Sequence, residues 1–164
     1  EHAKLPDSMI QDLVMMKLNA VGLRNAAKLK PSEISGGMAR RIALARAVAL
    51  DPQLIMYDAP FAGLDPISMG VTATLIRNLN NALGSTSILV SHDVHETFLI
   101  ADYVSFLSQG KIVAQGTPKE MLESTDPYVK QFVHAESDGP VPFHYPGKSM
   151  AQEIGLKSSS GDQT

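Results

Sequence analysis

The stretch LIMYDAPFAGLD, residues 54–65, sets the architecture expected for this chain. Its first four residues are apolar and predict a short buried strand that ends at Asp58. A strand followed by a carboxylate is typical of a site for a nucleotide and Mg²⁺, because this ion takes hard oxygen ligands. The alternative for a lone Asp58 is a capping or turn role. The next residue, Ala59, carries no group that can move a proton.

Predicted helices lie on both sides of this stretch. Apolar residues at helical intervals predict a helix from a capping box at Ser8 up to Gly22. The alanine-rich residues 38–50 predict a second helix, and Asp65 before a proline predicts the start of a third, which ends at Gly84. The face of the third helix that is expected to enter the core consists of Val71, Leu75, Ile76, Leu79 and Leu83.

A second apolar run, SILV at residues 87–90, predicts another buried strand just before His92. Asp93 and Glu96 then have capping-box spacing for a further helix. Strands that are joined through helices predict a parallel sheet covered by helices, which is the α/β class. In such sheets ligands bind beyond the carboxyl ends of the strands, so Asp58 and His92 can share one site. The alternative for a lone histidine is a structural role.

Smaller elements follow. The runs YVSFL and KIVAQ flank SQGK and predict a hairpin, and short helices are expected to start at TPKE and DPYV. From about Asp138 the chain contains several prolines and then SSSGDQT, which predicts an extended arm followed by a disordered tail.

Composition excludes several classes of function. The 164 residues include 44% apolar and 19% charged residues, as in ordinary globular chains. The net charge of −3 argues against a nucleic-acid partner held by broad phosphate contacts. The chain has no cysteine, which excludes disulfides, thiolate metal sites and cysteine nucleophiles. No apolar run approaches the roughly 20 residues of a membrane-spanning helix.

A small glycine-rich turn, Ser35-Gly36-Gly37, precedes the alanine-rich helix. Two glycines let the backbone approach a ligand closely, and the free N–H groups of the helix start suit a phosphate. The alternative is an ordinary serine N-cap followed by flexible glycines, and for this turn taken alone it is the favoured interpretation.

In their order and spacing, these motifs resemble the nucleotide-binding subunits of ATP-binding-cassette (ABC) transporters. ISGGM resembles their signature motif, LIMYD their Walker B motif, AGLD their D-loop and SILVSHD their switch histidine. The resemblance covers roughly residues 5–136 and implies a P-loop NTPase-like α/β fold. It assigns residues 1–34 to the helical subdomain, 35–136 to the C-terminal part of the ATPase core and 137–164 to a C-terminal arm and tail.

A narrower resemblance is to the ATPase subunits of Mla-type phospholipid-trafficking systems. It is carried by the run from SGGMARR to GLDPISMG, by the late DGPVPFHYPG, and by Met38 where ABC proteins commonly have glutamine. That family pairs its ATPase with a membrane permease and an Mce-type lipid-binding protein at the bacterial inner membrane. The resemblance therefore implies a cytoplasmic subunit held on the membrane by the permease, with an arm that reaches the partner ATPase subunit.

The resemblance also implies roles for single residues. In ABC ATPases two subunits clamp two ATP molecules between them. Ser35, together with the glycines that follow it, would bind the γ-phosphate held by the opposite subunit. Asp58 would support Mg²⁺, through water, and His92 would sense the γ-phosphate. Asp65 would connect the two sites across the dimer.

Two parts of the family pattern are missing. No phosphate loop of the form G-x-x-x-x-G-K-[ST] occurs, and the family places that loop upstream of the residues where this chain begins. We therefore expect a C-terminal fragment of a longer ATPase, the alternative being a split or truncated gene product. Ala59 stands where the family has a catalytic glutamate, and loss of a general base costs about 10²- to 10⁴-fold in rate.

The alanine has three interpretations: a deliberate change that traps the ATP-bound dimer, a naturally degenerate subunit, or a site in which another residue compensates. The leading expectation is an ABC ATPase subunit of a lipid transporter that is impaired in hydrolysis. One alternative is a non-catalytic clamp or regulatory subunit that closes on ATP. The other is a soluble ABC ATPase of DNA repair or translation, which the acidic balance disfavours.

Overall fold

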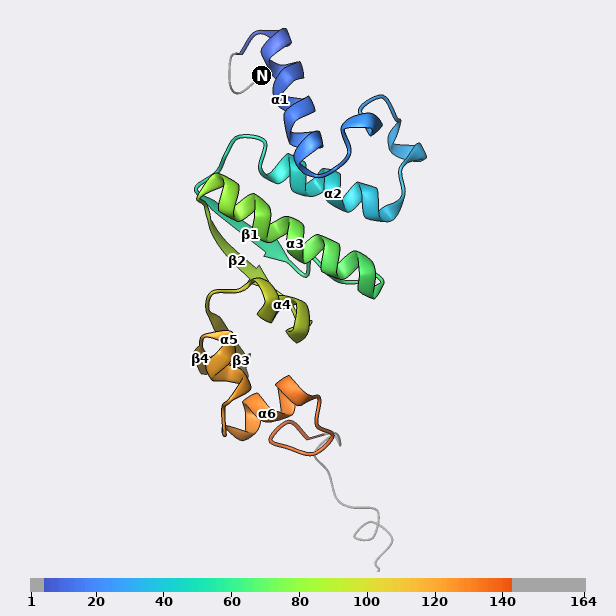
Figure 1. Ribbon diagram of the computed structural model, residues 1–164. Coiled ribbons are helices and arrows are strands. Elements are labelled where there is room, and N and C mark those ends of the chain that lie inside the picture. The colour runs from blue at the N-terminus through green and yellow to red at the C-terminus, as the bar shows by residue number, and fades with distance from the viewer. Residues whose placement is uncertain (1–4, 143–164) are drawn as a thin grey trace, which may run out of the picture. The chain divides into compact units, whose positions relative to one another are not determined.

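The computed structural model describes residues 5–142 of the chain (Figure 1). Its helices, short 3₁₀ turns and strands follow one another as α1 (Asp7–Ala20), η1 (Arg24–Ala26), η2 (Pro31–Glu33), α2 (Gly36–Ala47), β1 (Leu54–Asp58), α3 (Pro66–Leu83), β2 (Thr86–Val90), α4 (Val94–Ile100), β3 (Val104–Ser108), β4 (Lys111–Gly116), α5 (Pro118–Leu122) and α6 (Pro127–His134).

These residues form two compact units. The first runs to Val104 and includes Gly116–Pro118, and the second contains Ser105–Gln115 and the described residues from Lys119 onward. The first unit holds α1 to α4 with β1 and β2, and the second holds the β3–β4 hairpin with α5 and α6. The division at residues 34/35 and 136/137 that the family resemblance implies stays a prediction.

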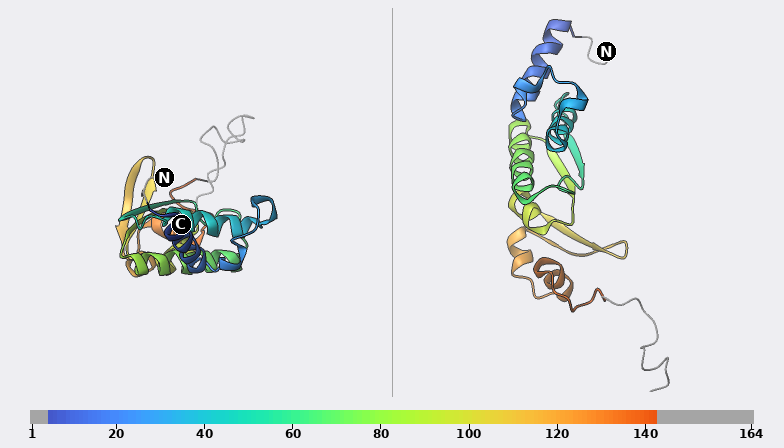
Figure 2. Two further views of the ribbon diagram at one scale, coloured as in Figure 1. Left: turned by 90° about the horizontal axis from the view of Figure 1, so that it is seen from above. Right: turned by 90° about the vertical axis from the view of Figure 1, so that its right-hand side faces the viewer.

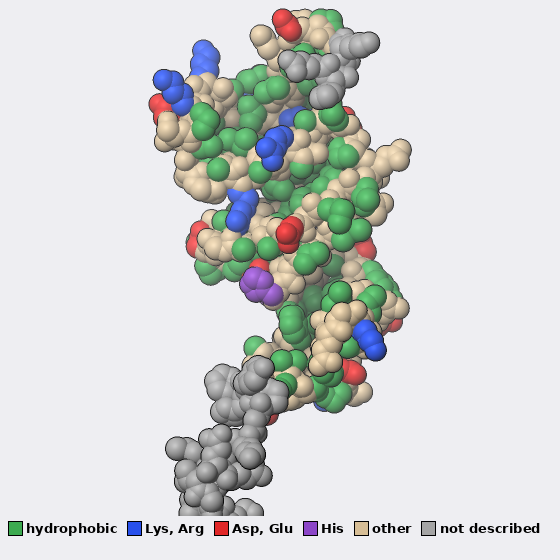
Figure 3. Space-filling view, turned by 180° about the vertical axis from the view of Figure 1, so that it is seen from behind, with side chains coloured by type: hydrophobic (Ala, Val, Ile, Leu, Met, Phe, Trp, Pro, Cys, Tyr) green, Lys and Arg blue, Asp and Glu red, His purple; other side chains and the backbone are tan. Residues whose placement is uncertain are grey.

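The β1–β2 pair is parallel, and α3 connects its two strands. This confirms the predicted strand–helix–strand unit of an α/β fold. The prediction that both strands are buried is wrong: β1 alternates, with Ile55 and Tyr57 buried but Leu54 and Met56 exposed by 51% and 72%. Helix α3 lies on one side of the pair only (Figure 2). The view from behind in Figure 3 shows hydrophobic side chains exposed on the other side.

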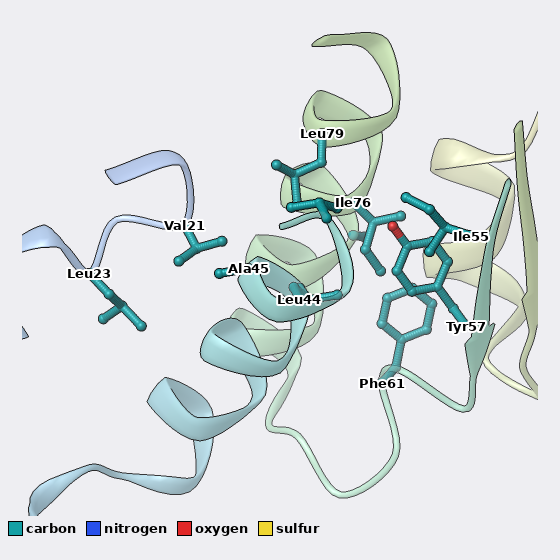
Figure 4. Packing of buried hydrophobic residues seen from close by; sticks show 11 residues of the cluster. Val21, Leu23, Leu44, Ala45, Ile55, Tyr57, Phe61, Ile76 and Leu79 are labelled. Carbon is teal, nitrogen blue, oxygen red and sulfur yellow. The ribbon is translucent and has the colours of Figure 1, made fainter. Parts of the chain in front are cut away.

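One hydrophobic cluster joins most elements of the first unit. Its buried members are Val21, Leu23, Leu44, Ala45, Val48, Ile55, Tyr57, Phe61, Ala73, Ile76 and Leu79 (Figure 4). They come from the end of α1, from α2, from β1 and the loop after it, and from α3. These elements therefore share one core, and burying it is the main stabilising contribution to this unit.

Helix α1 begins differently from its prediction. It starts at Asp7 after Pro6, and no side chain caps it, so the capping box at Ser8 is wrong. The φ of Pro6, −59°, already suits a helix start, and this places the first turn one residue before Ser8. The predicted end is confirmed, because Gly22 takes the left-handed conformation with φ +71° just after the helix.

A partly buried ion pair links α1 to the loop that follows α2, with Lys17 buried and the Asp51 side chain 60% exposed. Lys17 is 9% exposed, and its ammonium group contacts the carboxylate of Asp51. Asp51 has a φ of +47°, and it lies in the turn that forms because α2 ends at Ala47 instead of the predicted residue 50. Aspartate tolerates this left-handed conformation better than most residues.

Helix α3 confirms its predicted limits. Asp65 caps its first turn, and Gly84 ends it in the left-handed conformation. Its predicted core face is only partly right: Ile76 and Leu79 are buried, whereas Val71 is 52% exposed. Arg77 donates to the backbone oxygen of Ile100 and to Asp102, and so fastens α3 to the end of α4.

The second unit confirms the predicted hairpin and short helices. Gln109 and Gly110 both have positive φ in the turn between β3 and β4, as a tight hairpin requires. Phe106 of β3 packs edge-on against Phe132 of α6, with ring centres 5.5 Å apart. The predicted arm and tail lie mostly outside the described residues.

The start of that arm is fastened to α6 by one side chain. The amide of Gln131 donates to the oxygen of Val141 at 2.9 Å, and its own oxygen accepts from the Val141 N–H at 2.8 Å. Gly139 makes room for this amide, since a Cβ there would lie 2.5 Å from Gln131. Within residues 5–142, no helix is long and apolar enough to cross a membrane.

Asp51→Asn is expected to lower the free energy of unfolding by about 1–3 kcal/mol, because it leaves the buried ammonium of Lys17 without its charged partner. Asparagine keeps the tolerance for positive φ, so the backbone is not the cause of the loss. In urea unfolding, the double variant Lys17→Met/Asp51→Asn should be more stable than Asp51→Asn alone. Equal stability of the two variants would contradict this explanation.

Gly139→Ala is expected to push the Gln131 amide aside and to break both of its bonds to Val141. Hydrogen exchange of the Val141 amide should then become faster by roughly tenfold or more, since a protecting bond is lost. Gly70→Ala is the matched control, because a Cβ at Gly70 would meet no atom within 4 Å. Unchanged exchange at Val141 in Gly139→Ala would refute the role of Gly139.

Candidate functional site

The carboxyl ends of β1 and β2 lie at the same edge of the parallel pair. Asp58, the last residue of β1, is in register with Val90, the last residue of β2. The N–H of Ala59 donates to the oxygen of Val90 at 2.8 Å and extends the ladder by one bond. His92 follows two residues after Val90. The structure thus places Asp58 at the end of β1 and His92 just beyond the end of the neighbouring β2, where ligands bind in α/β sheets.

Asp58 is exposed at the end of β1. No group of three or more His, Asp or Glu side chains gathers among residues 5–142 in a way that could hold a metal ion. This donor set does not fit an all-protein metal cage. It fits Mg²⁺, which keeps several waters and takes one or two carboxylates beside substrate phosphates.

Ala59 has a φ of +43°, in the left-handed region that a residue with a Cβ rarely adopts. The bend redirects the chain from β1 into a loop whose Phe61 is 1% exposed and belongs to the core. The backbone at position 59 is therefore held by the β2 bond on one side and by the buried Phe61 on the other. The methyl group of Ala59 supplies no hydrogen-bonding function.

His92 is well placed to meet a ligand from solvent. Its side chain is 75% exposed, and its Nε2 lies 3.9 Å from the Asp93 carboxylate. The predicted capping box of Asp93 and Glu96 is wrong, because the Asp93 carboxylate accepts from the Ser91 hydroxyl at 3.1 Å and does not cap α4. The Ser91 hydroxyl thus takes the place of the backbone N–H groups of α4 as the donor to this carboxylate.

Ser35 caps α2, and its Oγ accepts from the Met38 N–H at 3.2 Å. This is the capping role that the turn alone favoured, and it still leaves the hydroxyl hydrogen free to be donated. A Cβ on Gly36 or Gly37 would meet no atom within 4 Å. The packing of the described chain therefore gives no reason for these glycines, whereas close approach of an outside group would give one.

The Asp65 carboxylate accepts from the N–H groups of Ile67 and Ser68, both at 3.0 Å. The hydroxyl and the N–H of Ser68 hold the pKa of this carboxyl below its usual value. Asp65 is therefore ionised and fixed at the start of α3, in the loop that also carries Asp58 and Ala59 at its other end.

One side chain in this region was not predicted from the sequence. Arg40 of α2 donates from Nη1 to the backbone oxygens of Pro60 at 3.2 Å and Ala62 at 2.6 Å. It ties the helix that Ser35 caps to the loop that follows Asp58. The only signal in the sequence is the pair Arg40-Arg41 after SGGMA, and the sequence does not indicate which carbonyl groups either arginine meets.

The ABC transporter family model matches residues 7–62. Over 154 residues, the chain is 58% identical to the intermembrane phospholipid transport system ATP-binding protein MlaF of Haemophilus influenzae. Over most of its length the chain is therefore similar to the ATP-binding proteins of ABC transporters. The match covers 94% of the chain and 58% of the Haemophilus protein. The MlaF protein of Escherichia coli K12 is also 58% identical, over 89% of the chain and 54% of its own length.

Other relatives are more distant. A probable ribonucleotide transport ATP-binding protein of Mycobacterium leprae is 40% identical over 86% of the chain and 41% of its own length. The chain thus spans about half the length of the relatives it matches. The solved structure of cbiO1 from Clostridium perfringens, part of an ABC transporter complex, superposes with a TM-score of 0.69 at 30% identity, covering 73% of the chain and 48% of cbiO1.

A pH titration can test the cap of α3. Because the folded pKa of Asp65 is lowered, its stabilising contribution is complete above the ordinary value of 3.8 and is lost as the pH falls through the folded pKa. Asp65→Asn still caps the helix but does not titrate. The stability advantage of the parent over Asp65→Asn should therefore shrink as the pH falls from about 4 through the folded pKa. A constant difference over this range would contradict the role of the ionised carboxylate.

Proposed function

We propose that this ABC ATPase chain binds and hydrolyses ATP with Mg²⁺ in a dimer of ATPase subunits and so drives phospholipid trafficking. The observation that carries the proposal is the identity of 58% to MlaF over nearly the whole chain. It is supported by Asp58 and His92 at neighbouring strand ends and by a capped helix start at Ser35.

In this proposal the chain contributes to two ATP sites. Asp58, with His92 on the neighbouring strand end, belongs to the site in its own subunit. The exposed Asp58 carboxylate holds the waters around Mg²⁺, and the His92 imidazole donates to the γ-phosphate. Because phosphoryl transfer depends chiefly on positioning and charge, these two groups need fixed places more than reactivity. The ladder bond from Ala59 to Val90 keeps the two strand ends together.

Ser35, Gly36 and Gly37 belong to the site of the opposite subunit. The first N–H groups of a helix have no partner inside that helix, and the 12-residue helix α2 adds the positive end of its dipole. The Ser35 hydroxyl donates its free hydrogen to the γ-phosphate. Asp65, ionised and fixed at the start of α3, connects the two sites across the dimer.

The partners follow from the same likeness. We propose a membrane permease and an Mce-type lipid-binding protein as partners, no nucleic acid, and a place on the cytoplasmic side of the inner membrane through the permease. Co-purification of the full chain with a permease supports this assignment, whereas co-purification with DNA-repair or ribosomal factors would favour a soluble ABC ATPase.

A second candidate function rests on Ala59, which supplies no general base. In it the chain is a clamp or regulatory subunit that closes on ATP and does not turn it over. The bond from the Ala59 N–H to the Val90 oxygen holds the backbone without any carboxylate at position 59, and this supports a subunit that binds ATP and closes without that group.

The test uses the longer ATPase expected from the sequence, called the full chain below. In it, Ala59→Glu is expected to raise kcat for ATP by about 10²- to 10⁴-fold, because it restores a base for the attacking water. Ala59→Gln, of similar shape but without a base, is the control and should stay slow. Steady-state phosphate release measures both variants, and light scattering measures ATP-dependent dimerisation.

Each outcome decides between the two candidates. Fast turnover only in Ala59→Glu supports an impaired ATPase, and ATP-dependent dimers without turnover in any variant support the clamp. A parent chain that hydrolyses ATP as fast as Ala59→Glu would refute the missing base. A full chain that does not bind ATP at all would refute the nucleotide-binding function.

A further inference from the structure

Helix α2 is fastened on two sides by adjacent arginines. Arg40 donates to the oxygens of Pro60 and Ala62, whereas Arg41 donates to the oxygen of Val21 at 3.4 Å, at the end of α1. The Arg40 bonds are partly buried and the shorter of the two measures 2.6 Å. Arg40 therefore holds the loop after β1, and Arg41 holds the helical region before α2.

The two acceptors of Arg40 flank a residue of the core. Pro60 and Phe61 are buried, and Phe61 lies next to Tyr57 in the hydrophobic cluster (Figure 4). Anchored in this way, the loop cannot move away from α2 without either breaking the bonds to the guanidinium group or exposing Phe61. A guanidinium group suits this task, because its donors have a fixed planar geometry and it stays charged.

The same loop carries the groups of the chain's own ATP site. Asp58 and Ala59 come just before Pro60, and Asp65 comes three residues after Ala62. At the other end of the connection, Arg40 stands five residues after Ser35 on one rigid helix. A displacement of α2 at its Ser35 end is thus transmitted directly to the loop.

We infer that Arg40 is a positioning residue that couples two parts of one subunit. One part is Ser35, which binds the ATP of the opposite subunit, and the other is Asp58, which binds the ATP of its own subunit. This inference rests on the proposed function, in which Ser35 acts on the ATP of the opposite subunit. Phosphate binding at the start of α2 then sets the position of Ala59 and Asp65, and so links the two ATP sites of a dimer. No contact between Arg40 and ATP is required.

The test uses the full chain with Ala59→Glu as the reference enzyme. Arg40→Met removes both bonds and keeps the apolar stem, and kcat should fall roughly ten- to a hundredfold, in keeping with the loss of charged hydrogen bonds. The Hill coefficient for ATP should fall toward 1. Arg40→Lys restores a charged donor and should recover part of both quantities.

Arg41→Met is the matched control, because Arg41 bonds to the end of α1 and not to the loop. It should retain the Hill coefficient of the reference enzyme. If Arg40→Met unfolds, Arg40→Lys and Arg40→Gln supply the same comparison with milder changes. A folded Arg40→Met enzyme with unchanged kcat and Hill coefficient would overturn the inference.

A double variant adds a readout that a merely structural role would not move. Ser35 and Arg40 have separate hydrogen-bond partners, so independent effects of Ser35→Ala and Arg40→Met should multiply. If both act through α2, the double variant should lose clearly less activity than the product of the single losses. Purely multiplicative losses would overturn the coupling.

Failure of the proposed function gives a different result. If the Ala59→Glu reference neither binds ATP cooperatively nor hydrolyses it, the proposed function and this inference both fall. If the reference does so and the Arg40 variants match it, only the inference falls.

Discussion

The parallel pairing of β1 with β2 is the constraint on which the rest of the first unit depends. Its register sets Asp58 opposite Val90, and the bond from the Ala59 N–H to the Val90 oxygen closes the ladder at the carboxyl end. A shift by one residue would turn Ile55 and Tyr57 out of the core. It would also separate Asp58 from the turn that carries His92. Core packing and site geometry are therefore fixed by the same hydrogen bonds.

Local chemistry was enough to predict the parts of the fold that local chemistry controls. The cap at Asp65, the stop at Gly84 and the turn at Gln109 each depend on side-chain or backbone preferences within a few residues, and all are present. The failures have competing neighbours as their cause. Pro6 moves the start of α1 ahead of Ser8. The Ser91 hydroxyl donates to the Asp93 carboxylate, which was expected to cap α4.

Sequence patterns did not predict which strand faces are covered or which residues far apart in the chain are in contact. Apolar runs such as LIMY do not reveal how many faces of a strand are covered, and Leu54 and Met56 are in fact exposed. Motif order singled out Ser35 and Asp58 as candidates, but it did not show that Arg40 joins α2 to the loop after Asp58, because the acceptors of Arg40 are backbone oxygens. A backbone oxygen has no residue-type signature, so such a contact can be found only in three dimensions.

In the proposed function, the geometry at position 59 separates nucleotide binding from turnover. The left-handed backbone there is imposed by the strand bond before it and by the buried Phe61 after it, and it does not depend on the side chain. An alanine in this place removes a proton acceptor and leaves the loop, the strand ends and the helix α2 in position. In the proposed function, such a chain keeps the surfaces that bind the nucleotide but lacks the base that hydrolysis uses. An assembly that closes around ATP would then stay closed, because closure does not need that base.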